Sequence, residues 1–391
     1  MKNRIDTTTV LEELIRAVSG ELAEAIRGIG VRPAASALVD ELLHRCSRPN
    51  LDGRVDFHLK VTFEAEQIDY VVEFGDESLT AELGVPSSPW ARIEITIEGL
   101  AKALFGRPSS SAAIGWVHEA LQVPSPETRP AELREMLKIM DGAIRANNAL
   151  LSALSPRRVS LEELAYRFGT DKWGTVHWYT PHYEEHFGAF IDERVRVLEI
   201  GIGGYDEPES GGASLRMWQQ YFRRGVIYGL DVHEKRIDGP RIRTLQGDQG
   251  DRAFLRQMSV DEGPFDIIID DGSHLNRDVL ASFDALFPLL KDGGLYVIED
   301  LQTSYWPAWG GALPDRATNT TSIGFLKTLI DGLHHREIDV SSSYLDQNVI
   351  GLHFYHNLAF IAKGPNRECG APPSVRDLAP GQAPASSTEP E

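Results

Sequence analysis

The sequence predicts an α/β protein in which a smaller α+β domain precedes a Rossmann-like, mostly parallel sheet with a terminal antiparallel hairpin. Three observations support this fold class. Residues 54–98 alternate apolar and polar side chains with a period of two, which is typical of short strands. Residues 194–204 form an apolar run that leads directly into glycines. Residues 266–300 contain two apolar runs joined by a helical stretch, the pattern of parallel strands with a crossover between them.

The composition narrows the class of protein and of partner. With 391 residues, the chain is long enough for two domains and a tail. A formal net charge of −19 repels phosphate backbones and anionic lipids, so we expect neither nucleic acid nor membrane partners. Its two cysteines, Cys46 and Cys369, lie far apart and indicate neither a disulfide framework nor a zinc site. The first residues lack a signal-peptide pattern, so we expect a cytoplasmic protein.

The N-terminal part shows no catalytic pattern. Residues 8–48 carry apolar side chains at helical spacing with a break at 30–33, which predicts two amphipathic helices. Their apolar stripe is either core or an oligomer seam. Residues 54–98 predict a small antiparallel sheet. Helices are also expected near 112–122 and 130–153.

Domain boundaries follow from the linker at 155–158. We predict an auxiliary and oligomerisation domain at 1–155 and a catalytic domain at 156–364. Residues 365–391, rich in Pro, Ala, Ser and Glu, predict a disordered tail. An aromatic and histidine-rich run at 177–187 either packs against the sheet or forms a lid over a cofactor and substrate.

A cofactor site is expected where the first strand of the catalytic domain ends. Glu199 in that strand is followed by Gly201 and Gly203, which allow close backbone approach to a ligand. The turn lacks the G-x-G-x-x-G form, and the acids at 206–209 would repel a pyrophosphate, whereas a sulfonium cofactor is positively charged. Ser214 is the expected N-cap of the next helix.

The next two predicted strands also end in residues that could contact this cofactor. Asp231 ends the strand at 226–230 and either grips ribose hydroxyls or forms a turn. The strand at 241–246 runs into Asp248 and Gln249, where a side chain either reaches adenine or belongs to a plain turn.

Two pairs of acids follow the next two strands. Asp270 and Asp271 end the first, and Glu299 and Asp300 end the second, so all four reach the carboxyl edge of the sheet. Each acid alone fits a turn or a helix cap. Together they repel one another unless a hard divalent cation lies between them. His274 stands beside them, and a metal with an imidazole indicates proton removal from a hydroxyl.

The C-terminal part adds an aromatic loop and a hairpin. Residues 301–311 carry tyrosine and tryptophan side chains that either stack on a sugar or pack internally. Residues 337–346 and 349–362 predict the two arms of the terminal hairpin.

Taken together, the stretches at 168–172, 197–201, 230–231, 269–274 and 298–300 resemble the macrolide and deoxysugar O-methyltransferases of natural-product pathways. The resemblance covers about residues 155–363 and, in overall length and in the presence of an N-terminal auxiliary domain, the whole chain. It implies Mg2+-dependent methyl transfer from S-adenosylmethionine to a sugar hydroxyl of a glycosylated macrolide or other polyketide in antibiotic biosynthesis. The expected acceptor is the 2-hydroxyl of a deoxysugar such as rhamnose or deoxyallose. It also implies a homotetramer.

The resemblance also implies roles for individual residues. Asp271, Glu299 and Asp300 would bind Mg2+, and His274 would be the general base, whereas Asp270 keeps a structural role. The residues implied around S-adenosylmethionine are Thr170, Glu199, Gly201, Gly203, Ser214, Asp231, Asp248, Gln249 and Asp271. Two alternatives remain, namely an NAD(P)-dependent sugar-nucleotide enzyme and a non-catalytic protein that binds S-adenosylmethionine.

Overall fold

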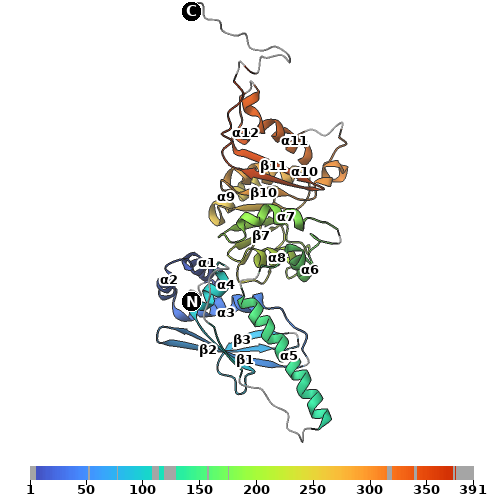
Figure 1. Ribbon diagram of the computed structural model, residues 1–391. Coiled ribbons are helices and arrows are strands. Elements are labelled where there is room, and N and C mark those ends of the chain that lie inside the picture. The colour runs from blue at the N-terminus through green and yellow to red at the C-terminus, as the bar shows by residue number, and fades with distance from the viewer. Residues whose placement is uncertain are drawn as a thin grey trace, which may run out of the picture. The chain divides into compact units, whose positions relative to one another are not determined.

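Figure 1 shows the fold of the chain in a computed structural model, which describes residues 6–51, 53–76, 78–107, 114–118, 129–155, 158–174, 176–314, 319–338, 341–372 and 375. By their contacts the residues divide into two compact units. Unit 1 comprises Met1–Arg196, Ile202–Gly229 and His233–Gln246, and unit 2 comprises Val197–Gly201, Leu230–Val232 and Gly247–Glu391. The domain boundaries at 155 and 364 remain predictions.

Three helices open the chain, α1 (Thr7–Ala17), α2 (Leu22–Ile29) and α3 (Val31–Arg45). The side chain of Asp6 caps α1 by accepting from the backbone N–H of Thr9. The sequence predicted two helices here, and the structure has a second break because the chain turns at Gly20, whose N–H donates to Ala17 O at 2.9 Å. The apolar stripe of α1 is buried, so it belongs to the core.

A five-stranded sheet follows, in the order β3-β2-β1-β4-β5. Its strands are β1 (Val55–Phe63), β2 (Glu66–Phe74), β3 (Leu79–Leu83), β4 (Ala91–Thr96) and β5 (Gly115–His118). Phe57, Leu59 and Val61 alternate with polar residues along β1 and are buried. Helices α4 (Ile97–Phe105) and α5 (Pro130–Leu154) contact β1.

Two predictions for this part were wrong. The sheet is mixed, because β1 pairs with β2 antiparallel and with β4 parallel after the excursion through β2 and β3. In place of a helix near 112–122, residues 115–118 form β5, antiparallel to β4. Trp116 and Val117 favour a strand, and pairing with β4 outweighs the helical pattern. The rest of that predicted helix, apart from Ile114, lies outside the described residues.

The second sheet has seven strands in the order β11-β12-β10-β9-β6-β7-β8, and it confirms the predicted Rossmann-like class. Its strands are β6 (Arg196–Ile200), β7 (Val226–Asp231), β8 (Ile242–Gln246), β9 (Ile267–Asp270), β10 (Leu295–Ile298), β11 (Val349–Tyr355) and β12 (Leu358–Lys363). Strand β9 is parallel to both β6 and β10, and β12 is antiparallel to β10 and β11. Every residue of β9 and β10 is buried, as expected of parallel strands covered on both faces.

The remaining α-helices are α6 (Leu161–Phe168), α7 (Thr180–Phe187), α8 (Ala213–Tyr221), α9 (Arg252–Glu262), α10 (Asn276–Leu286), α11 (Ser322–Leu333) and α12 (Tyr344–Asn348). Short 3-10 helices are η1 (Gly188–Phe190), η2 (Phe287–Leu289), η3 (Leu301–Tyr305), η4 (Pro307–Trp309) and η5 (His335–Glu337). Among the described helices, none combines the length and apolarity needed to cross a bilayer.

The terminal hairpin is present, but its predicted first arm was wrong. Residues 344–348 form α12, and the two arms are β11 and β12. They meet in a two-residue turn at His356 and Asn357, where Asn357 has a φ of 63°. The predicted disordered tail lies outside the described residues, except for residues 365–372 and 375.

Candidate active site

The strands that precede the predicted acids end in register with one another in the second sheet. Asp270, the last residue of β9, pairs with Ile200 of β6 on one side and with Ile298 of β10 on the other. Beyond the strands, the N–H of Asp271 donates to Ile200 O and the N–H of Glu299 donates to Asp270 O, both at 3.0 Å. The ends of β6, β9 and β10 therefore bring their acids to the same edge.

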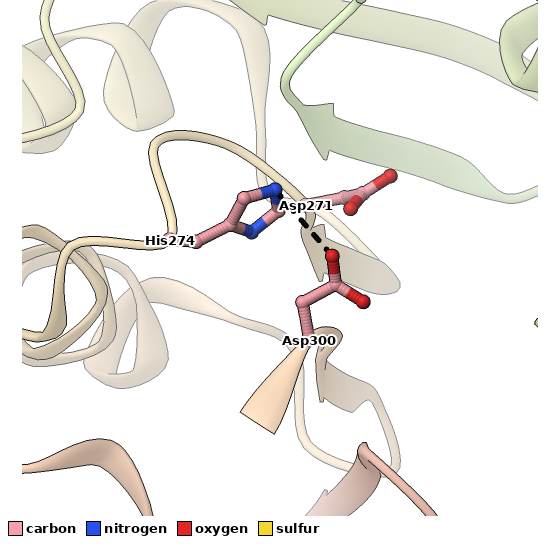
Figure 2. A group of neighbouring side chains, drawn as sticks. All are labelled: Asp271, His274 and Asp300. Carbon is pink, nitrogen blue, oxygen red and sulfur yellow. Dashed lines mark ion pairs between the residues drawn. The ribbon is translucent and has the colours of Figure 1, made fainter. Parts of the chain in front are cut away.

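Two overlapping groups of side chains at this edge have the spacing of metal ligands. One group contains Asp271, His274 and Asp300, and the other contains Glu199, Asp271 and Glu299; in each, the ligand atoms lie within 4.8 Å of one another. Figure 2 shows the His274 ring and the Asp300 carboxylate facing each other beside Asp271, with His274 Nε2 3.6 Å from Asp300 Oδ2. Asp271 belongs to both groups, whereas Glu299 and Asp300 belong to one each. Carboxylate oxygens are the ligands that Mg2+ prefers, so the donors fit this ion.

The backbone at two of these residues adopts an unusual conformation. His274 has a φ of 55° and Asp300 has a φ of 53°, both in the left-handed region that side-chain-bearing residues rarely enter. Such conformations cost of order 1–3 kcal/mol each and persist where the surrounding structure enforces them, often at functional sites. Here they aim the imidazole and the carboxylate toward each other.

Asp270 lies outside both groups and points into the interior. Gln249 Nε2 donates to its Oδ1 at 2.6 Å, and the hydroxyls of Ser282 and Tyr296 donate to its Oδ2. Burial raises the pKa of Asp270 to about 6 despite these donors. Gln249 Oε1 accepts from the N–H of Ser273 at 2.9 Å, so the Gln249 amide links Asp270 to the loop that carries His274.

Glycines allow the backbone segments of the site to touch. At Gly201, which has a φ of 93°, a Cβ atom would overlap the carbonyl oxygen of Asp271. At Gly272 a Cβ atom would overlap Gln249 Oε1. Gly203, with a φ of 76°, has open space where a Cβ would be, as the approach of a ligand to the backbone requires.

The other predicted cofactor residues divide between the units. Asp231, the half-buried last residue of β7, and the exposed Asp248 lie in unit 2 with Glu199, Gly201, Gln249 and Asp271. The side chain of Asp248 accepts from the N–H of Gly250 at 2.7 Å, a contact that is typical of a turn and favours the turn alternative for this residue. Thr170, Gly203 and Ser214 belong to unit 1. Thr170 is buried and accepts from the N–H of Lys172 at 3.5 Å.

Ser214 does not cap α8, contrary to the prediction. The N-cap is Gly212, with a φ of 71°, and Ser214 is the second helical residue. The N–H of Gly212 donates to Ile202 O at 2.8 Å, which fixes the start of the helix two residues earlier. A capping pattern read from side chains alone cannot detect such a backbone contact.

The two aromatic segments differ in burial, and in the first of them Trp178 is exposed while other rings are packed. Tyr183 and Phe187 of α7 are buried against Trp218, so packing explains them. Trp306 and Trp309 form an edge-to-face pair with centroids 5.4 Å apart, and both remain exposed. Exposed aromatic faces beside a site suit the apolar side of a sugar or a polyketide.

Sequence reasoning missed Asn276, the first residue of α10. Its amide nitrogen donates to the carbonyl oxygens of Thr303 and Trp309, and its Oδ1 accepts from the N–H of Ser322 and the hydroxyl of Ser304. Asn276 therefore ties the helix that follows His274 to the aromatic loop. Its position two residues after a candidate base was the only signal.

Proteins of known function match this chain over most of its length. A family profile described as the MycE methyltransferase N-terminal domain matches residues 11–115. The chain is 39% identical over 380 residues to the mycinamicin VI 2''-O-methyltransferase of Micromonospora griseorubida, covering 95% of this chain and 94% of that protein. The 8-demethyl-8-alpha-L-rhamnosyl tetracenomycin-C 2'-O-methyltransferase of Streptomyces olivaceus is 40% identical over 394 residues, covering 95% of this chain and 100% of that protein.

The chain belongs to the macrolide and deoxysugar O-methyltransferase family. A solved structure of MycE methyltransferase in complex with Mg, SAH and mycinamycin VI aligns with this member of the family at a TM-score of 0.83 and 40% identity. The alignment covers 93% of this chain and 95% of that one. The sugar O-methyltransferase fold thus extends over both the first and the second sheet.

Proposed function

We propose that this protein transfers a methyl group from S-adenosylmethionine to a sugar hydroxyl of a glycosylated polyketide, the 2-hydroxyl of a deoxysugar such as rhamnose or deoxyallose, in antibiotic biosynthesis. The observation that carries the proposal is the placement of Asp271 in two metal-capable groups, one of which contains His274. The named relatives act on a mycinamicin and on a rhamnosyl tetracenomycin, which supports a glycosylated acceptor.

The oxygen donors fit Mg2+, and we propose that Asp271, Glu299 and Asp300 hold it. Asp271 is common to both groups. It lies at ligand spacing from Glu299 in one group and from Asp300 in the other. A bound Mg2+ supplies positive charge that lowers the pKa of an adjacent sugar hydroxyl. Glu199, which groups with Asp271 and Glu299, serves the cofactor side in this proposal.

The proposed cofactor contacts follow the strand ends. Asp231 would bind the ribose hydroxyls of S-adenosylmethionine, and the open space at Gly203 leaves room for close backbone approach. Thr170, Gly201 and Ser214 complete the proposed set, together with Asp248, Gln249 and Asp271. Because the amide of Gln249 already bonds to Asp270 and Ser273, its cofactor contact would come from the backbone.

His274 acts as the general base in the proposed reaction. The hydroxyl O–H bond breaks and the proton moves to Nε2, the ring atom that faces Asp300. The oxygen uses the released electron pair to bond the methyl carbon, and the carbon–sulfur bond breaks to leave S-adenosylhomocysteine. Asp300 then stabilises the protonated imidazole across 3.6 Å. Exposed Trp306 and Trp309 would shield the acceptor from water.

We further propose that the chain forms a homotetramer in the cytoplasm. Helix α5 supports the assembly, because Leu137, Ile144 and Leu151 recur every seven residues and are exposed. An apolar stripe of this kind suits a helix of a second copy.

Methyl transfer is tested by incubating the protein with S-adenosylmethionine and a panel of glycosylated polyketides, and by mass spectrometry of the products. We expect a product heavier by one CH2 unit, lost with EDTA and restored by Mg2+. Full turnover in EDTA would overturn the metal assignment. Binding of the cofactor with no product from any glycoside would indicate a non-catalytic binder, and an unfolding midpoint raised by NAD(P) would indicate the nicotinamide alternative.

A further inference from the structure

Unit 1 contains a cavity with a charge opposite to that of the chain. Its volume is about 260 Å3, and it lies among α3, the α5–α6 connection and the end of α8. Among the described residues, the charged side chains that line it are four arginines, Arg45, Arg158, Arg167 and Arg223, and two acids, Glu163 and Asp192. The lining therefore has two positive charges in excess, in a chain whose net charge is −19.

The inner wall of this cavity is short of negative charge. Arg45 Nε and Arg241 Nη2 both donate to Oε1 of Glu41, at 2.8 Å and 2.9 Å, and Arg223 lies close by. Although burial opposes it, Arg241 and Arg45 lower the pKa of Glu41 to about 2. Burial, with repulsion from Arg241 and Arg223, lowers the pKa of Arg45 to about 9. Arg45 and Arg241 thus share one carboxylate, while Arg223 Nη2 donates to the backbone carbonyl oxygens of Ala103 and Leu104. An anion in the cavity would reduce the repulsion among these three guanidinium groups.

The outer wall carries cations that can reorient. Arg158 is ion-paired with Asp192, and Arg167 Nη2 lies 3.0 Å from Glu163 Oε1. Both arginine side chains are more than one third exposed, so these pairs contribute little to stability and exchange readily for another anion. Tyr221 also lines the cavity, and burial raises the pKa of its hydroxyl, which stays a hydrogen-bond donor.

We propose that this cavity binds a small oxyanion of the phosphate class through Arg158, Arg167 and Arg223. Guanidinium groups match the oxygens of phosphate in pairs, and several arginines line this one cavity. The proposal concerns unit 1 alone and stands whether or not the protein methylates a sugar.

Inorganic phosphate is the probe for this site. Thermal unfolding of the full chain, without Mg2+, is followed as sodium phosphate replaces sodium chloride at constant ionic strength. We expect a saturable rise in the unfolding midpoint. Arg158→Gln and Arg167→Gln should each raise the dissociation constant for phosphate about tenfold or more.

Two further variants test the sign of the charge effect. Glu163→Gln removes a negative charge from the lining and should tighten phosphate binding several-fold. Arg256 of α9 is an exposed arginine paired with Asp284 of α10, and Arg256→Gln should leave phosphate binding unchanged. A midpoint that responds equally to phosphate and chloride would overturn the proposal, and so would a dissociation constant that Arg158→Gln and Arg167→Gln leave unaltered.

Discussion

At the scale of single residues, the candidate site depends on a histidine with a constrained backbone. His274 and Asp300 both hold left-handed φ values, and their side chains face each other beside Asp271. Neither position has the glycine that such a conformation favours. The surrounding structure therefore holds both residues in a costly conformation, which is often observed at functional sites.

Replacing His274 by alanine tests the base directly. We expect kcat to fall roughly 10²-fold, because the proton of the acceptor hydroxyl loses its destination. The dissociation constant of S-adenosylhomocysteine, measured by calorimetry, should stay unchanged. His356→Ala, in the exposed hairpin turn, is the matched control and should keep normal turnover. A near-normal kcat in His274→Ala would remove this residue from the chemistry.

Gln249 contacts the loop that carries His274, the proposed base, and Gln249→Met should test whether this contact positions the loop. The substitution keeps the side-chain length but removes the bonds to Asp270 and to the N–H of Ser273. We expect kcat to fall about tenfold, since each lost bond to a buried group costs roughly 1–3 kcal/mol. The affinity for S-adenosylhomocysteine should change much less than kcat.

The control for this variant lies on α9. Gln257→Met removes a bond between an exposed glutamine and Asp261, and it should leave kcat unchanged. The positioning role would be contradicted if Gln249→Met weakened cofactor binding as strongly as it lowered kcat. That result would instead support a direct contact of its side chain with the cofactor.

At the scale of elements, one buried carboxylate joins segments that are distant in sequence. Glu41 of α3 accepts from Arg241, just before β8, which also donates to the carbonyl oxygens of Gln219 and Phe222 at the end of α8. Arg45, also of α3, donates to Leu104 O of α4 and to Glu41. These bonds satisfy helix-end carbonyls that would otherwise be buried without partners.

Glu41→Gln should destabilise the protein by about 3 kcal/mol or more, because the arginines lose their buried counter-charge. The lowered pKa of Glu41 makes this contribution complete above its ordinary value of 4.5, and it is lost as the pH falls toward about 2. Urea unfolding of both proteins should therefore show a large difference at pH 7 that narrows below pH 4.5. A difference that grows on acidification would contradict the assignment.

At the scale of the whole molecule, the exposed stripe on α5 predicts the assembly. Ile144→Glu places a charge in the middle of this stripe and should convert the proposed tetramer to smaller species in size-exclusion chromatography with light scattering. Lys138→Glu changes the charge of the same helix outside the stripe and should leave the assembly intact. Equal masses for wild type and Ile144→Glu would rule out α5 as the interface.

The sequence predicted much of the second sheet because its strands carry strong signals. Near-continuous apolar runs such as 267–269 and 295–298 end in acids, and the structure forms buried strands at these runs. It failed where contacts between distant residues decide the outcome. Residues 115–118 became a strand through pairing with β4, and α8 starts at a glycine held by Ile202. Neither contact can be read from local pattern.

The candidate site was predictable to a similar extent. Acids at strand ends identified the edge, but the division of Glu299 and Asp300 between two groups needed side-chain positions. The Gln249 and Asn276 networks consist of bonds across 21 to 46 residues of sequence, which no spacing rule detects.

The contacts at Gly201 and Gly272 limit how this enzyme can be redesigned. Any larger residue at Gly201 would collide with the backbone of Asp271, so saturation mutagenesis there should return glycine alone among active clones, whereas at Gly272 the Gln249 side chain would have to move. Libraries aimed at new acceptors would be better directed to Trp306 and Trp309, whose exposed rings tolerate exchange without disturbing the backbone that holds the reactive groups.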